Sequence, residues 1–172
     1  MLQDSVRRYL EDNADLEQLR GYVEGDAALA QKLHRGLLDL GVHLTLLPEA
    51  HGGLGMGILE AALIQQMLGR YVAPSGFAAA YALAVVGLEA ATPEQQADWL
   101  GRIANGEVVM GVGLTEATGA REQSGLILTG EKAAGRASFV MTSENATHFM
   151  LTAGDDLLIV ARDDKTISQS AL

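Results

Sequence analysis

The stretch TPEQQADWLGRIANGEVVMGVGLTEA, Thr92 to Ala117, changes from a helical to a strand pattern within a few residues. The run T-P-E-Q at residues 92–95 is a capping box with proline at the first helical position, which predicts a helix start. We expect the helix to end at Gly106, since glycine is preferred just after a helix. From Val108 to Leu114 large apolar residues recur at every second position, as in a strand, which sets Gly111 and Gly113 on the other face of that strand.

Upstream of this stretch the chain carries only helical signals. The third segment has Asp26 as N-cap, leucines at helical spacing and Gly41 as its stop, and Ser75 is the expected cap of an alanine-rich helix. The other expected helices are Leu2–Asp12, Asp15–Glu24 and Ile58–Arg70, the last with Ile64, Met67 and Leu68 as its deepest residues.

Downstream, short strands are expected at LILTG, SFVMTS, HFMLTA and LLIVAR, separated by turn residues. Close spacing without an intervening helix favours antiparallel hairpins or a meander. The sequence thus predicts an α+β fold, an N-terminal all-α helical bundle at residues 1–107 followed by a small antiparallel β domain at 108–172. Such a domain leaves sheet edges unpaired, so we expect either a piece of a longer protein or a subunit completed by a partner.

The loop LTLLPEAHGGLGMG, Leu44 to Gly57, raises the question of a phosphate-binding site. The dinucleotide fingerprint G-x-G-x-x-G opens a helix directly after a strand. Here Gly53 and Gly55 supply the first pair, but Ile58 stands at the third position and a helix precedes the loop. We therefore interpret the loop as a corner between two helices.

Composition narrows the possible partners. The chain has 12 basic and 22 acidic residues, a net charge of −10, which argues against nucleic acid or an anionic membrane. There is no cysteine, no signal peptide pattern, and no metal-ligand spacing among the four histidines, so no metal site is expected. The apolar stretch Val72–Ala91 is rich in alanine and interrupted by polar residues, which indicates a buried helix of a soluble, cytoplasmic protein and no membrane association.

The order of motifs resembles the acyl-CoA dehydrogenase family, from its N-terminal helical domain into its middle β domain. The resemblance runs from about Leu37 to Lys132 and is carried by PEAHGGLG, GEVVMGVGLTE and GEK in the expected order. It implies an oxidoreductase of lipid metabolism, acting on CH–CH bonds by flavin-dependent α,β-desaturation of an acyl-CoA thioester with FAD as hydride acceptor. It also implies that the P-E-x-x-G-G loop joins two helices.

The resemblance further implies a set of cofactor-binding residues. Leu114 and Thr115 would hydrogen-bond the flavin ring, Gly113 (with Gly111) would allow close approach to it, and Gly119 is the glycine left in the position of the pyrophosphate loop. Alternatively, the two strand glycines accommodate a bulky helix from the first half of the chain.

Three features depart from the family pattern. The G-S-D of the pyrophosphate loop is absent, no aromatic residue follows G-E-K to cover the flavin, and the chain ends at Leu172 without the C-terminal domain that carries the catalytic glutamate. No catalytic residue is therefore assigned. Two hypotheses stay open: an acyl-CoA dehydrogenase-like protein inactive as this chain alone, in a homo- or hetero-oligomer with an acyl-CoA dehydrogenase-type subunit, or a non-catalytic structural subunit that stabilises a catalytic partner.

Overall fold

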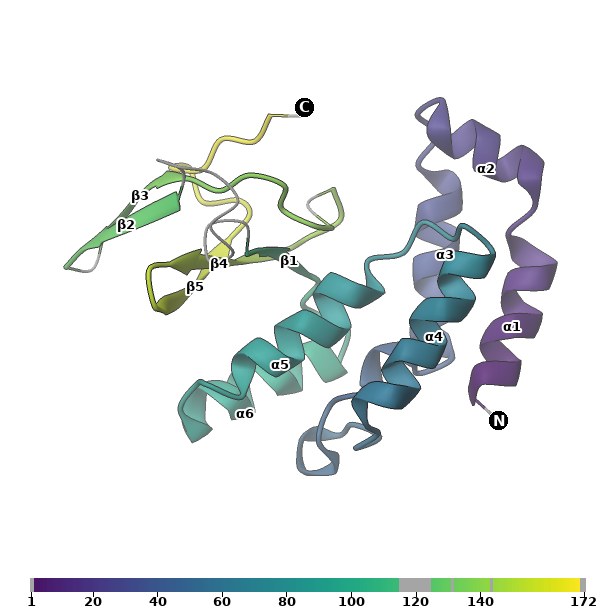
Figure 1. Cartoon of the computed structure of the whole chain (residues 1–172), viewed down its shortest axis with the longest axis horizontal. Coiled ribbons are helices and arrows are strands. Elements are labelled where there is room, and N and C mark those ends of the chain that lie inside the picture. The colour runs from purple at the N-terminus through teal and green to yellow at the C-terminus, as the bar shows by residue number, and fades with distance from the viewer. Residues whose placement is uncertain (1, 115–124, 131, 143, 171–172) are drawn as a thin grey trace.

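The computed structural model describes residues 2–114, 125–130, 132–142 and 144–170. Helices occupy the first part of the chain and strands the second, and α5 and α6 lie against the strands while α1 to α4 lie farther away (Figure 1). The α+β class expected from the sequence is confirmed. The helical elements are α1 (Leu2–Asn13), α2 (Leu16–Val23), α3 (Ala28–Asp39), η1 (Val42–Leu44), η2 (Glu49–His51), α4 (Ile58–Arg70), η3 (Ala78–Leu83), α5 (Ala84–Leu88) and α6 (Pro93–Ala104).

The boundaries of α6 follow the predicted capping chemistry. Thr92 Oγ1 accepts a hydrogen bond from the backbone N–H of Gln95 at 3.3 Å, and Gln95 Oε1 accepts one from the backbone N–H of Thr92 at 3.1 Å. Gly106 follows the helix with φ of 71°, and Gly41 follows α3 with φ of 73°, which are left-handed conformations that glycine adopts without strain. The helix start and both helix stops read from the sequence are confirmed.

Two predicted caps are displaced by a residue. Asp26 accepts a hydrogen bond from the backbone N–H of Ala28 at 2.8 Å, but Ala27 is the residue that precedes α3. Ser75 stands two positions before the first helical residue, Phe77, so it is not the cap of the alanine-rich helix. One residue, Ala27 or Gly76, therefore separates each predicted cap from its helix.

The helical core forms where α1, α3 and α4 meet. Among the largest fully buried side chains are Leu10, Leu33 and Leu68. In α4 the prediction holds for Ile64 and Leu68, which are buried, whereas Met67 is half-buried. No helix among the described residues has the length and apolar character needed to cross a membrane.

The Leu44–Gly57 loop is a corner between η1 and α4, as expected. The backbone N–H of Leu54 donates to the carbonyl of Leu44 at 2.8 Å, which closes the loop on itself. A Cβ on Gly53 would strike the carbonyl group of Leu47, so only glycine fits there. The loop is thus shaped by backbone packing.

In the part of the chain that the structure describes, the strands form two small sheets: β1 (Met110–Gly113), β2 (Gly125–Thr129), β3 (Lys132–Arg136), β4 (His148–Ala153) and β5 (Asp156–Ala161). One sheet has the order β1-β4-β5 and the other is the β2-β3 hairpin. The pair β4-β5 is antiparallel, as expected, and so is the pair β2-β3. The expectation is wrong for β1, which pairs with β4 in parallel.

Strand assignment also differs at two places. The predicted strand SFVMTS is reduced to one bridge between Met141 and Val112, because Phe139 and Thr142 have positive φ values of 53° and 62° that interrupt an extended chain. The strand β3, sequence KAAGR, was not expected, since alanine and glycine are weak strand formers.

Candidate functional site

The glycine face of β1 is filled by the neighbouring strand. The parallel register sets Gly111 beside Phe149 and Gly113 beside Leu151. A Cβ on Gly111 would lie 2.8 Å from Phe149 Cδ1, and one on Gly113 would lie 2.8 Å from Leu151 Cδ2. Both glycines are buried, so they accommodate large side chains of β4 and not a helix from the first half of the chain.

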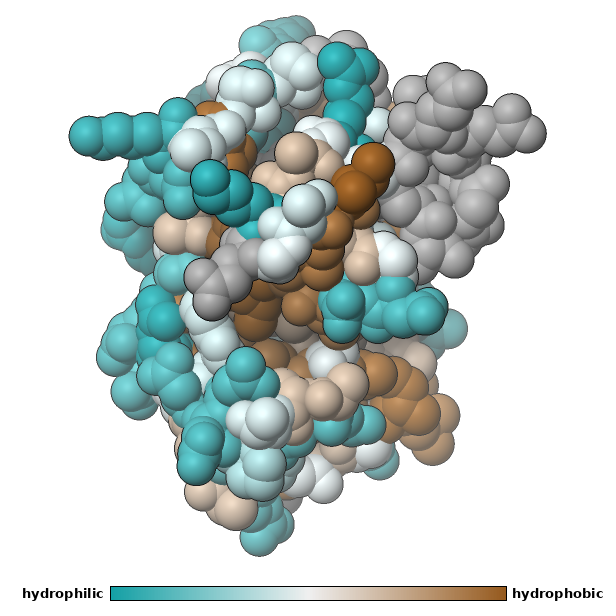
Figure 2. Space-filling view, turned by 90° about the vertical axis from the view of Figure 1, so that its left-hand side faces the viewer, coloured by the Kyte–Doolittle hydropathy of each residue, from teal (hydrophilic) through white to brown (hydrophobic). Residues whose placement is uncertain are grey.

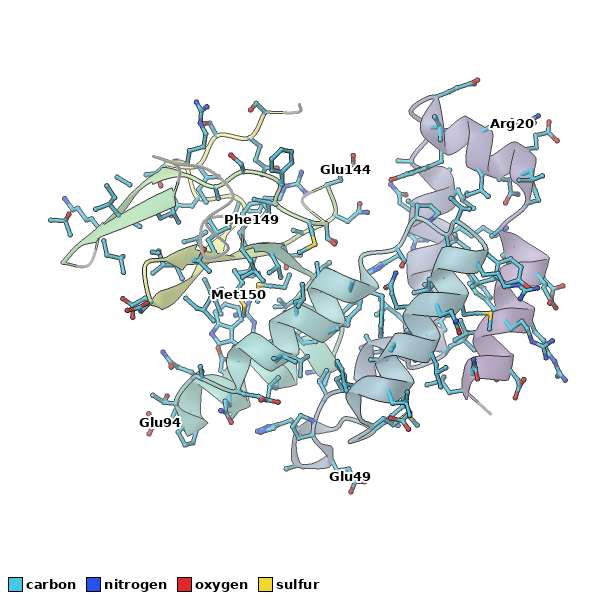
Figure 3. The ribbon with its side chains drawn as sticks, viewed as in Figure 1. Arg20, Glu49, Glu94, Glu144, Phe149 and Met150 are labelled. Atoms are coloured by element: carbon cyan, nitrogen blue, oxygen red, sulfur yellow. The ribbon has the colours of Figure 1, made fainter. Side chains whose placement is uncertain are left out.

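The opposite face of this sheet packs on the helices. Met110, Val112 and Met150 are almost fully buried, and β1 contacts η3 and α5. Figure 3 shows Phe149 and Met150 on opposite sides of β4, with Met150 directed toward α5. A Cβ on Gly87 of α5 would lie 2.8 Å from Met150 Sδ, so a small residue in α5 makes room for this side chain.

The structure describes two of the four predicted cofactor-binding residues. Gly113 is in the packed face just described, and Leu114 is half-buried and packs against the hydrophobic core. Thr115 and Gly119 lie outside the described residues. The side chains of Phe149 and Leu151 pack against the glycine face of β1. Contact of FAD with Gly113, Leu114, Thr115 and Gly119 stays a prediction.

A polar and aromatic cluster joins α6 to β4. The Trp99 ring meets the His148 ring edge-on at 5.1 Å between centroids, and Arg102 Cζ lies 4.6 Å from the centroid of Trp99. Arg102 Nη2 is 3.4 Å from His148 Nε2. Burial lowers the pKa of His148, the positive charge of Arg102 lowers it further, and the negative charge of Asp163 opposes both effects. The cluster links the helices to the strands.

A second cluster lies inside the helical part, where α3, η1 and η3 meet. The Tyr81 ring lies 6.3 Å from His34 and 5.8 Å from His43, measured between ring centroids. His43 Nε2 is 3.1 Å from the carbonyl oxygen of Ala104 at the end of α6. These three side chains line a cavity with about 10 Å³ of space for the centre of a water molecule.

Burial controls the ionisation of this second cluster. It raises the pKa of Tyr81 well above its ordinary value. Burial also lowers the pKa of His34, and the nearby His43 lowers it further. For His43, burial lowers the pKa while the hydrogen bond to Ala104 opposes the shift. At neutral pH the cluster is therefore uncharged.

Neither cluster could be recognised from the sequence. The four histidines follow no metal-ligand spacing in the sequence, and no motif includes Tyr81. His34 of α3 and His43 of η1 meet at the Tyr81 ring, which is 47 and 38 residues farther along the chain. Within the described residues, no group of three or more His, Asp or Glu side chains could hold a metal ion.

Comparison with known proteins gives one family match. The family model described as acyl-CoA dehydrogenase, N-terminal domain, matches residues 1–107. No curated protein matches the chain.

Solved structures are similar over nearly the whole chain. The ChsE4-ChsE5 complex from Mycobacterium tuberculosis is 25% identical with a TM-score of 0.81, and the match covers 99% of this chain and 49% of that chain. A variant of the Tcur3481-Tcur3483 steroid ACAD is 28% identical with a TM-score of 0.78, covering 94% and 47%. An acyl-CoA dehydrogenase complexed with FAD from Bacillus anthracis shares the fold, with 21% identity and a TM-score of 0.79. That match covers 99% of this chain and 32% of the Bacillus anthracis chain. The chain thus spans half or less of these relatives' length.

Proposed function

The chain belongs to the acyl-CoA dehydrogenase family through its N-terminal domain, and we propose that it is one part of an assembly that desaturates an acyl-CoA thioester with FAD. In this proposal residues 1–107 form a helical domain and residues 108–172 a β domain. The end of α6 at Ala104 and the start of β1 at Met110 support that division. The assembly would act in lipid metabolism in the cytoplasm.

The observation that carries the proposal is exposed apolar surface on this chain. On α4, Ile58 is 68% and Leu59 is 66% exposed. Val86 of α5 and Leu157 of β5 are also exposed. Figure 2 shows apolar residues gathered across the middle of one face of the molecule. Contiguous exposed apolar surface marks sites of protein contact more often than isolated residues do.

The partner we propose is a second chain of acyl-CoA dehydrogenase type. Two of the similar structures carry paired chain names, ChsE4-ChsE5 and Tcur3481-Tcur3483, which supports an oligomer of related chains. A homo-oligomer is the other form of this proposal. In either case the flavin would lie where this chain meets its partner, because the glycine face of β1 is filled by its own protein.

A second candidate function follows from that same filled face. Since Phe149 and Leu151 pack on the two glycines, the chain fits a non-catalytic subunit that stabilises a catalytic partner without touching FAD. The two candidates differ in whether this chain contacts the cofactor.

Reconstitution tests the proposal. The purified chain would be mixed with FAD alone and with an acyl-CoA dehydrogenase-type chain from the same organism, and flavin absorbance and acyl-CoA-dependent dye reduction would be measured. For the hetero-oligomer we expect bound flavin and activity only in the mixture, whereas a homo-oligomer would bind flavin when this chain is mixed with FAD alone. Activity of the partner that is unchanged by this chain would contradict both candidates.

A substitution separates the two candidates. Thr115→Ala in the assembly is expected to weaken FAD binding if this chain contacts the flavin, and to leave it unchanged if the chain is a structural subunit. Thr166→Ala is the matched control, because among the described residues its hydroxyl donates to Asp164 of its own turn, at 2.6 Å.

A further inference from the structure

The cavity beside Tyr81 contains two buried polar atoms that lack partners. Within the described residues, Tyr81 Oη and His43 Nδ1 have no hydrogen-bond partner. Both side chains are buried, with exposed fractions of 5% for Tyr81 and 8% for His43. Leaving such groups unsatisfied costs about 1–3 kcal/mol each, so native proteins nearly always satisfy them. Both side chains line the same cavity, which also borders Ser75.

The hydrogen bond of His43 fixes which of its nitrogens carries the proton. Nε2 faces the carbonyl oxygen of Ala104 at 3.1 Å, and a carbonyl oxygen can only accept. Nε2 must therefore be protonated. Because the lowered pKa keeps the ring neutral at neutral pH, Nδ1 is left as an acceptor that needs a donor.

The hydroxyl of Tyr81 has the complementary need. Burial raises its pKa, so it stays protonated and is available as a donor. No direct hydrogen bond joins it to His43, whose ring centroid is 5.8 Å from that of Tyr81. The missing group must accept from the tyrosine and donate to the histidine, which a water molecule does.

We propose that a single water molecule occupies this cavity, accepts a hydrogen bond from Tyr81 Oη and donates one to His43 Nδ1. The space of about 10 Å³ for the molecule's centre matches one water and excludes larger ligands. The hydroxyl of Ser75 is available as a third partner, and buried waters typically make about three hydrogen bonds. The water would join η3 to η1 and, through His43, to the end of α6.

Two features of the surroundings support this site. Tyr81 lies in the π-helical turn η3, in which the backbone N–H of Ala84 bonds to the carbonyl of Ala79, and such turns occur often at functional positions. His34 lines both the cavity and a surface hollow that also borders Gln31 and Arg35, so the cavity lies close to solvent.

A crystal structure at a resolution that shows ordered water tests the proposal on the full chain. We expect one density peak within hydrogen-bond distance of both Tyr81 Oη and His43 Nδ1. An empty cavity, or a direct contact between the two atoms without water, would overturn it.

A second measurement uses nitrogen NMR of His43 in solution. We expect a protonated Nε2 and a hydrogen-bonded, unprotonated Nδ1 whose signal moves toward that of a free imidazole nitrogen in Tyr81→Phe. Tyr22→Phe, which removes a hydroxyl outside the cavity, should leave the signal in place. A proton on Nδ1, or equal Nδ1 signals in the wild type and in Tyr81→Phe, would refute the site. If Tyr81→Phe does not fold, the crystal structure of the wild-type chain still decides.

Discussion

The packing of Gly111 against Phe149 can be tested with one methyl group. We expect Gly111→Ala to lower the free energy of unfolding by about 1–3 kcal/mol, because its Cβ would lie 2.8 Å from Phe149 Cδ1 and 3.2 Å from Ala146 Cβ. Urea unfolding measures this. The matched control is Gly101→Ala in α6, where nothing lies within 4 Å of the new Cβ, and a gain of about 0.5–1 kcal/mol is expected. Equal effects of the two substitutions would contradict the filled glycine face.

The cluster of His34 and His43 predicts a dependence of stability on pH. Both pKa values are lowered in the folded protein, so below about pH 6.5 the unfolded chain binds protons that the folded chain does not. The free energy of unfolding should therefore fall as the pH drops through that range.

Urea midpoints at about pH 7.5 and about pH 5.5 measure this dependence. We expect a smaller fall in His34→Gln and His43→Gln than in the wild type. The control His51→Gln, which changes a histidine outside the cluster, should keep the full fall. The prediction fails if all four proteins respond alike.

At the scale of elements, the start of α6 depends on a reciprocal pair of hydrogen bonds. Thr92→Ala removes the acceptor for the backbone N–H of Gln95 and is expected to cost about 1 kcal/mol of unfolding free energy. Thr92→Ser keeps a hydroxyl at the cap and should retain most of the stability. Thermal unfolding of the two variants gives the comparison, and a loss as large for serine as for alanine would rule out the capping role.

The elements show which structural information is local in the sequence. Helix limits at Thr92, Gly41 and Gly106 follow from side-chain and backbone chemistry within a few residues, so they could be predicted. The parallel pairing of β1 with β4 joins residues such as Gly111 and Phe149, which are far apart along the chain. Local spacing does not encode that pairing. For the same reason, the sequence could not predict that Phe149 and Leu151 pack against the two glycines.

At the scale of the whole molecule, the exposed apolar face of α4 should act in association. We expect the double substitution Ile58→Asn with Leu59→Gln to leave the free energy of unfolding within about 0.5 kcal/mol, since both side chains are exposed. It should weaken binding to an acyl-CoA dehydrogenase-type partner about tenfold or more. Gln65→Ala, at another exposed position of α4, is the control. Unchanged Kd in the double variant would exclude this face from the interface.

The measurement that tests the central claim most directly is the visible absorption spectrum of the purified chain with FAD, taken alone and after addition of an acyl-CoA dehydrogenase-type partner. The account predicts that flavin remains bound through gel filtration only when the partner is present, because the glycine face of β1 is filled by Phe149 and Leu151. A chain that retains stoichiometric FAD by itself, and whose flavin is bleached by an acyl-CoA, would contradict the hetero-oligomer with a separate partner chain.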